Sequence, residues 1–182
     1  MAGKNVLISG AGMLGLVACA MCQTAGATNI IALDIDLTRL ALARQFGANA
    51  VFDALDSWQM KLKGERITYE IIIETSGMAD AMEQTLAELA IGGTAVWVGA
   101  VMPHRPLQID AEKVVRRLHT LKGLHNYNLE DLKTAISFIE QHHQHYPFAE
   151  NILDHFGLNE VQEAFAFAAD TQPLRVAITV ST

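Results

Sequence analysis

Short apolar runs alternate along the chain with longer segments in which apolar residues recur at helical spacing. The runs predict strands over residues 5–9, 29–33, 49–53, 69–75, 94–100 and 119–124. The segments between them predict helices over residues 10–26, 36–46, 78–90 and 111–117. We expect Gly92 and Gly93 to turn the chain before the fifth strand. Strands that alternate with helices of this length are typical of parallel βαβ units, so the sequence predicts an α/β fold with helices on both faces of the sheet.

The pattern changes after residue 124. Two further helices, over residues 129–143 and 158–169, precede one last strand over residues 174–180. We therefore predict a core domain over residues 1–125 and a C-terminal extension, with helices and a final strand, over residues 126–182.

Three glycines follow the first predicted strand and begin the first helix, in the pattern Gly10-x-Gly12-x-x-Gly15. In this context the first glycine permits a tight turn, the second lets the main chain approach a pyrophosphate, and the third lets helix and strand pack closely. Asp34 follows the second strand, where a carboxylate accepts hydrogen bonds from an adenosine ribose and repels a 2′-phosphate. The combination predicts a Rossmann fold with strand order 3-2-1-4-5-6 that binds NAD rather than NADP. The alternative is a glycine-rich packing turn beside an exposed aspartate.

Composition and charge narrow the class of partner. Of the 182 residues, 51% are hydrophobic and 18% are charged, which is typical of a chain with a packed core. The formal net charge of −7 argues against nucleic acid, because phosphate neutralisation needs clustered Lys and Arg side chains. No apolar run reaches the roughly 18 residues that a bilayer span needs, and the first residues lack the apolar stretch of a signal peptide. We expect a cytoplasmic protein without a membrane or nucleic acid partner.

Cys19 and Cys22 form a CxxC pair inside the first predicted helix. A structural zinc site needs about four ligands, and the chain has no other cysteine. A redox CxxC pair normally lies at an exposed helix start, whereas these two lie further along the helix among Ala, Val and Met. We expect two buried packing thiols.

The sequence contains no recognisable catalytic motif. It has no GxSxG nucleophile motif, and no Tyr is followed four residues later by the Lys of short-chain dehydrogenases. Glu74 ends a buried strand and is either catalytic or part of a crevice wall. We predict no catalytic residue and no metal ligand in this chain.

Seven segments carry a resemblance to a known family. They are GAGMLGL, ALDID with the following Arg39, RQFGAN, IETSG, GGTAVWVGAV, LKGLHNYNLEDL and LRVAIT. In this order they resemble the coenzyme-binding half of the medium-chain, zinc-dependent alcohol dehydrogenases, over nearly the whole chain. VVRRLHTLKGLHNY and the later YPF also resemble a subgroup proposed to act in phosphonate catabolism.

The resemblance implies where the coenzyme would lie. The pyrophosphate would meet the main chain of the glycine turn, and the adenosine ribose would lie beside the residues that follow the second strand. The residues that follow the fourth and fifth strands would line the crevice, and those after the sixth strand would lie near the nicotinamide carboxamide. An arginine of the last strand would reach back to a phosphate. In this order, the candidate cofactor-binding residues are Gly10, Gly12, Met13, Leu14, Gly15, Asp34, Ile35, Arg39, Thr75, Ser76, Val98, Gly99, Ala100, Leu124, His125 and Arg175.

The family's catalytic zinc lies in an N-terminal GroES-like domain, which we expect to be absent from this chain. In such enzymes zinc polarises an alcohol or aldehyde oxygen while hydride moves to or from nicotinamide. The resemblance therefore implies an NAD(H)-binding domain that is inactive alone. It also implies a homodimer, paired through the sheet edge near Leu107 to Asp110.

Two other functions stay open on the sequence. One is a non-enzymatic module that senses NAD or binds a partner in response to it. The other is a class I methyltransferase, whose sheet also begins with a glycine loop, although such enzymes usually carry an acid where this chain has Ser9.

Overall fold

Parallel strand pairing organises the first part of the chain. The structure, a computed structural model, describes residues 1–59 and 67–180, without the side chains of residues 153–155. The chain divides into two compact units, Met1–Tyr127 and Asn128–Thr182. The parallel sheet with the glycine turn belongs to the first unit.

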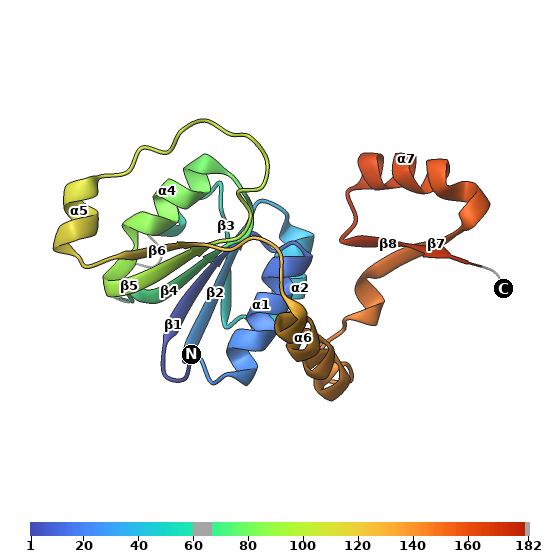
Figure 1. Cartoon of the computed structure of the whole chain (residues 1–182), viewed down its shortest axis with the longest axis horizontal. Helices are drawn as coiled ribbons and strands as arrows, with labels where there is room; N and C mark the ends of the chain where they lie inside the picture. Colours follow the sequence, from blue (N-terminus) through green and yellow to red (C-terminus); the bar gives the residue numbers. More distant parts are fainter. Residues whose placement is uncertain (60–66, 181–182) are drawn as a thin grey trace. The chain divides into compact units, whose positions relative to one another are not determined.

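The sheet contains six strands among the described residues, in the order β3-β2-β1-β4-β5-β6, and each neighbouring pair is parallel (Figure 1). The strands are β1 (Asn5–Ser9), β2 (Asn29–Asp34), β3 (Ala50–Asp53), β4 (Tyr69–Glu74), β5 (Leu89–Trp97) and β6 (Thr120–Gly123). The predicted fold class and strand order are confirmed. The strand order reverses between β1 and β4, which is where doubly wound sheets form a crevice at the carboxyl ends of their strands.

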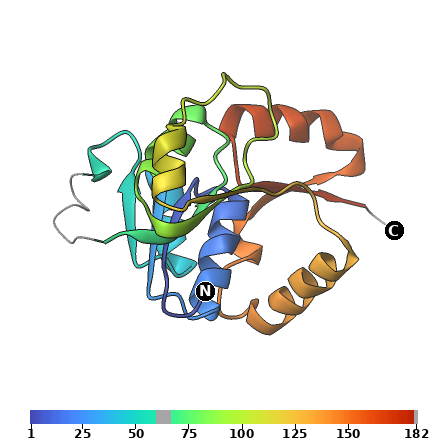
Figure 2. The same cartoon turned by 60° about the vertical axis from the view of Figure 1, so that its left-hand side comes forward.

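Helices cover both faces of this sheet. The helices α1 (Met13–Thr24) and α2 (Leu37–Gln45) contact β1, β2 and β3, whereas α4 (Ala79–Ala87) contacts β1, β4 and β5. Figure 1 shows α1 and α2 on one side of the sheet and α4 on the other. The short helix α5 (Ala111–Arg116) lies beside α4 in both Figure 1 and Figure 2.

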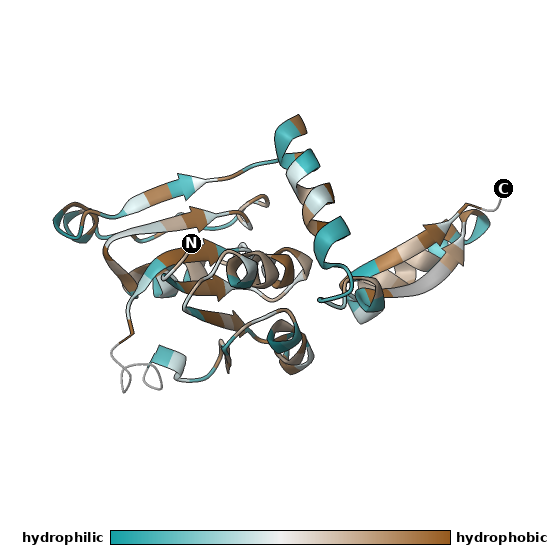
Figure 3. Ribbon diagram, turned by 90° about the horizontal axis from the view of Figure 1, so that it is seen from below, coloured by the Kyte–Doolittle hydropathy of each residue, from teal (hydrophilic) through white to brown (hydrophobic). Residues whose placement is uncertain are grey.

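The central strands β1 and β2 are apolar because both of their faces are covered. Val6, Leu7 and Ile8 are consecutive residues of β1, and all three are fully buried. Figure 3 shows the inner strands of this sheet mostly in the brown of hydrophobic residues. One cluster of buried hydrophobic residues includes Trp58, from the segment after β3, which the sequence pattern did not identify as a core residue. The cluster comprises Leu7, Ile31, Leu33, Trp58, Tyr69, Ile72, Leu86, Leu89 and Ala95.

The fifth strand differs from its prediction at both ends. It begins at Leu89 rather than at residue 94, and Gly92, at φ +74°, lies inside it. The amide of Gly92 donates to the Arg117 carbonyl at 2.8 Å, and the pairing register with β4 shifts between Tyr69 and Ile71. The predicted turn at Gly92 and Gly93 is therefore wrong, and these residues form an irregularity within a longer strand.

The second unit contains one strand more than the sequence predicted. Its helices are α6 (Leu129–His142) and α7 (Val161–Thr171), with short 3-10 turns at η1 (Ala149–Asn151) and η2 (Leu158–Glu160). The predicted final strand is β8 (Arg175–Thr179), and it pairs in parallel with the unpredicted β7 (Ile152–Gly157). The helix α7 connects and contacts both strands, so the unit contains a further βαβ arrangement. No helix in the described part of the chain is long and apolar enough to span a membrane.

Candidate functional site

Gly10 begins the turn after β1. It adopts φ +93°, which a residue with a side chain rarely adopts, and its amide donates to the Leu33 carbonyl at 2.8 Å. A Cβ atom at Gly10 would lie 2.7 Å from the Thr75 hydroxyl and 2.9 Å from the Ser76 amide nitrogen. Both the backbone conformation and the neighbouring β4 turn therefore require glycine at this position.

Gly15 and Gly12 differ in what surrounds them. A Cβ atom at Gly15 would overlap the Gly10 carbonyl, so the missing side chain lets α1 pack against the turn. Gly12 has an ordinary φ of −69°, and a Cβ atom there would meet no heavy atom within 4 Å. The space beside Gly12 is therefore open, and a side chain at this position would fill it.

The first turn of α1 presents backbone amides. The helix begins at Met13, Gly12 provides no side-chain cap, and the Leu16 amide donates to the Gly12 carbonyl at 2.9 Å. The amides of Met13 and Leu14 precede that bond, at the end of the helix where N–H groups lack intrahelical acceptors and the dipole is positive. Such a terminus, beside open space, suits a diphosphate.

The Asp34 carboxylate holds the glycine turn against the end of β2. Its Oδ2 atom accepts from the Ala11 amide at 2.6 Å, and its Oδ1 atom accepts from the Asp36 amide at 2.9 Å. Asp34 is half-buried, and its two oxygens have about four acceptor positions. The side chain can therefore hold the turn and still accept hydroxyl groups of a ligand.

The segment after Asp34 leads into α2. Ile35 is exposed, and Asp36 caps the helix by accepting from the Thr38 and Arg39 amides at 2.8 and 3.2 Å. The Arg39 Nε atom lies 3.6 Å from Asp36 Oδ2. Asp36 thus holds the Arg39 guanidinium near the end of β2.

The turn after β4 is bonded to the glycine turn. The Thr75 hydroxyl lies 3.0 Å from both the Ser9 and the Gly10 carbonyl oxygens, and the Thr75 amide donates to Ser9 at 2.7 Å. The Ser76 amide donates to the Glu74 carboxylate at 2.8 Å. Thr75 and Ser76 therefore lie directly beside the predicted pyrophosphate site.

The next two strands end at the same edge. The amides of Val98 and Gly99 donate to the Glu74 carbonyl at 2.8 and 3.1 Å, and the Val101 amide donates to Gly99 at 2.8 Å. The Leu124 amide donates to the Trp97 carbonyl at 3.0 Å, and His125 is exposed. All candidate residues of the first unit thus follow the carboxyl ends of β1, β2, β4, β5 and β6.

Arg175 is the one candidate residue outside the first unit. It is the first residue of β8 and is exposed, and its Nη1 atom donates to the adjacent Leu174 carbonyl at 2.7 Å. Its predicted contact with a phosphate stays a prediction.

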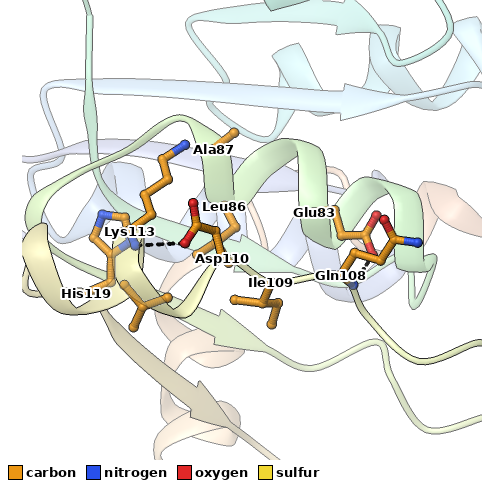
Figure 4. Close-up of a pocket in the computed structure, with 9 residues that line it drawn as sticks. Glu83, Leu86, Ala87, Gln108, Ile109, Asp110, Lys113 and His119 are labelled. Atoms are coloured by element: carbon orange, nitrogen blue, oxygen red, sulfur yellow. Dashed lines mark hydrogen bonds between the residues drawn. The ribbon is translucent and has the colours of Figure 1, made fainter.

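A cavity of about 200 Å³ lies between α4 and α5, away from the glycine turn (Figure 4). Both ring nitrogens of His119 are buried. Burial, and then the charge of Arg117, lower the pKa of His119. None of the candidate coenzyme residues lines this cavity, which is formed by Glu83, Leu86, Ala87, Gln108, Ile109, Asp110, Lys113, Val114 and His119.

The CxxC pair lies inside α1, as predicted, and both thiols are buried and free. Burial raises the pKa of Cys19 to about 12 and the pKa of Cys22 to about 11. In the part of the chain that the structure describes, no three His, Cys, Asp or Glu side chains are grouped to hold a metal ion. The pair therefore contributes to packing.

Comparison with known proteins identifies a matching family and curated relatives that are longer than this chain. The profile of a family described as zinc-binding dehydrogenase matches residues 14–141. L-threonine 3-dehydrogenase from Streptomyces avermitilis is 30% identical over 170 residues, which are 92% of this chain and 48% of that protein. The enzyme of the same name from Streptomyces coelicolor is 32% identical over 171 residues. The chain thus spans about half the length of the curated relatives it matches.

Solved structures share the fold. An alcohol dehydrogenase from Thermotoga maritima superimposes with a TM-score of 0.90 at 24% identity, covering 99% of this chain and 51% of that one. A short chain alcohol dehydrogenase from Escherichia coli CFT073, solved with NADH, superimposes with a TM-score of 0.85 at 15% identity and covers 99% of this chain and 52% of its own. These likenesses support the doubly wound sheet.

We expect both cysteines to resist modification in the folded chain. Thiolate is the reactive form, and raising the pKa from 9.0 to about 11 or 12 lowers the thiolate fraction at pH 8 about a hundredfold or more. Ellman's reagent should therefore react at least about a hundred times more slowly with the native chain than with the chain in guanidinium chloride. Fast reaction of either thiol in the native chain would contradict the buried placement of α1.

Proposed function

Because this chain belongs to the zinc-binding dehydrogenase family, we propose that it binds NAD(H) and forms the coenzyme-binding half of a zinc-dependent alcohol dehydrogenase. The observation that carries the proposal is the open space beside Gly12, next to the first amides of α1. A diphosphate fits there, because no side chain fills the space and the positive end of a helix lies beside it. The Asp34 carboxylate lies at the neighbouring strand end, where an adenosine ribose would follow.

Each part of the crevice has a binding role in this proposal. The Met13 and Leu14 amides donate to the pyrophosphate, and Asp34 accepts from the ribose hydroxyl groups. A 2′-phosphate in place of a hydroxyl group would meet the Asp34 carboxylate, so we propose NAD rather than NADP. The nicotinamide half then lies over β4, β5 and β6, against Ser76 and Gly99.

Bound NAD(H) supplies the hydride acceptor or donor of the reaction. The chain's own residues bind and orient the coenzyme. Thr75 bonds the β4 turn to the glycine turn, which fixes the distance between the two walls of the crevice. The backbone turn at Val98–Ala100 is fixed in the same way by the Glu74 carbonyl. These contacts hold one coenzyme conformation without a charged catalytic group.

An apolar rim around the crevice supports the proposal that a second domain covers it. Large hydrophobic residues, between 49% and 80% exposed, follow the carboxyl ends of the sheet strands within a few residues: Leu14, Ile35, Leu55, Met78, Val101, Met102 and Leu124. An exposed apolar set of this kind marks a surface that another part of a protein contacts. We propose that a further domain supplies the zinc and the substrate pocket, and that this chain alone has no turnover.

The substrate class is an alcohol or its carbonyl product. Relatives named L-threonine 3-dehydrogenase match along most of the chain, which supports a hydroxyl-bearing substrate. The narrower assignment to phosphonate catabolism rests on the sequence resemblance alone and stays a prediction.

We also propose a homodimer. In the described chain, β6 ends one side of the sheet, and an edge strand with unpaired backbone groups favours association. The segment near Leu107 to Asp110 contacts α4, because the Gln108 amide donates to the Glu83 carboxylate at 2.6 Å. A second copy paired along β6 would extend the sheet.

Replacing Gly12 by Val should abolish coenzyme binding without unfolding the chain. The valine side chain enters open space at an ordinary φ, so we expect little change in thermal unfolding. In the same space it excludes the pyrophosphate, and calorimetry should show NADH affinity reduced by about a hundredfold or more. Full NADH affinity in a folded Gly12→Val chain would place the coenzyme elsewhere.

Asp34 should set the preference for NAD. Calorimetry should show NADH binding at least about tenfold tighter than NADPH binding, because the 2′-phosphate meets a like charge. Asp34→Asn keeps an acceptor for the Ala11 amide and removes the charge, so this ratio should fall. Asp53→Asn removes the same charge at the end of the neighbouring β3 and should lower the ratio less. Equal NADH and NADPH affinities in the unaltered chain would remove the role of Asp34.

The runner-up function, a non-enzymatic NAD-sensing or interaction module, shares the coenzyme site and differs in what binding causes. Light scattering with and without NAD should show one dimeric mass under the first proposal and an NAD-dependent change of assembly under the second. Alcohol oxidation should be undetectable in both cases. Zinc-dependent oxidation at an ordinary enzymatic rate by this chain would refute the dependence on a second domain.

A further inference from the structure

Glu74 is a buried carboxylate at the point where the strand order reverses. It ends β4 and pairs in register with Ser9 of β1 on one side and Trp97 of β5 on the other. Its exposed fraction is 0%, so the carboxylate has lost its hydration. This loss costs free energy unless hydrogen bonds replace the water. A buried charge of this kind is retained only where several donors compensate it.

The donors come from the turn that follows. Glu74 Oε1 accepts from the Ser76 amide at 2.8 Å, from the Ser76 hydroxyl, and from the Gly77 amide at 3.1 Å. Glu74 Oε2 lies 3.2 Å from the same Gly77 nitrogen. Burial raises the pKa of Glu74, while the donors of Ser76 and Gly77 act in the opposite direction. The side chain therefore fixes the turn at Ser76 and Gly77.

The main chain of the same residue fixes the next turn. The Glu74 carbonyl accepts from both the Val98 and Gly99 amides, at 2.8 and 3.1 Å. The two turns also touch, since Gly77 adopts φ +74° and a Cβ atom there would overlap the Gly99 carbonyl. A displacement of Gly77 would therefore move Gly99 as well.

Among the described residues, the donors to the Glu74 side chain are Ser76 and Gly77, in the turn that Thr75 bonds to the glycine turn. The glycine turn and the first amides of α1 are held by Asp34 and Thr75, not by the Glu74 side chain. A dinucleotide at a switch point places one nucleotide over each half of the sheet. With the adenosine at Asp34, the nicotinamide ring lies over the turns that Glu74 holds.

We propose that Glu74 is a positioning residue for the nicotinamide half of the coenzyme, acting through the turns at Ser76–Gly77 and Val98–Gly99. This inference rests on the proposed NAD(H) binding. Glu74 does not touch the coenzyme, because its side chain is buried beneath the turns. Its effect should therefore depend on which part of the coenzyme is present.

The affinities for two ligands distinguish this positioning role from a general effect on the stability of the fold. ADP-ribose contains the adenosine, the pyrophosphate and the second ribose without the nicotinamide ring, whereas NADH contains all of them. Glu74→Gln keeps one acceptor oxygen but turns an NH₂ group toward the Gly77 amide. Calorimetry should show NADH affinity reduced about tenfold and ADP-ribose affinity reduced much less, about twofold.

Glu70→Gln is the matched control. Glu70 lies in the same strand, accepts from the Asn5 amide at 2.8 Å, and lies 3.6 Å from the Lys4 ammonium. It is remote from both turns, so neither ligand should bind this variant differently. Equal losses for the two ligands in Glu74→Gln, or no loss for either, would overturn the proposal.

Ser76→Ala provides a second route if Glu74→Gln does not fold. It removes one donor to the carboxylate, together with any contact between the Ser76 hydroxyl and the coenzyme, and should shift the NADH to ADP-ribose affinity ratio in the same direction. The coupling of this variant to Glu74→Gln then assigns the shift to Glu74. Where both variants fold, the double variant should show less than the sum of the two effects, because both act on one turn. An unchanged ratio in Ser76→Ala, or strict additivity, would contradict the proposal. Failure of the unaltered chain to bind either ligand would instead refute the proposed function.

Discussion

The hydrogen bond from the Ala11 amide to the Asp34 carboxylate, at 2.6 Å, is the contact on which the crevice depends. It fixes the glycine turn to the end of β2, and the Gly10 amide adds a bond to the Leu33 carbonyl at 2.8 Å. With the turn fixed on β2, α1 starts at a defined place and its first amides face one space. A helix dipole acts on a ligand only over its first turn, so this placement decides whether the amides can bind a diphosphate.

Much of the fold was predictable because a strand that is buried on both faces has a nearly continuous apolar sequence. Asn5–Ser9 matches its prediction at both ends, and Tyr69–Glu74 ends one residue earlier than predicted. The errors lie where long-range pairing overrides a local signal. Gly92 and Gly93 are a local turn signal, but Leu89 pairs with Tyr69 and extends the strand past them. β7 was missed because polar residues interrupt its apolar run, and only its pairing with β8 shows it as a strand.

The candidate site also combines features that the sequence could predict with features that only the folded chain shows. The glycine pattern and Asp34 are separated by fixed distances along a βαβ unit, so the sequence shows them together. The bond from the Thr75 hydroxyl to the Gly10 carbonyl joins residues 65 positions apart and requires the folded sheet. The cavity beside His119 combines residues of α4, α5 and the segments around them, and no sequence pattern relates these. Glu74 was visible as a carboxylate at a strand end, but its three donors were not.

Asp34 and Glu74 show how burial separates the roles of two similar groups. Each ends a strand that pairs with β1, and each accepts from the amides of an adjoining turn. Asp34 is half-buried, so it has acceptor positions left for a ligand and its charge acts on whatever enters the crevice. Glu74 is fully buried, and turn donors already occupy its carboxylate, so its charge acts on the backbone. A substitution at Asp34 should therefore change which coenzyme binds, whereas a substitution at Glu74 should change how a bound coenzyme is held.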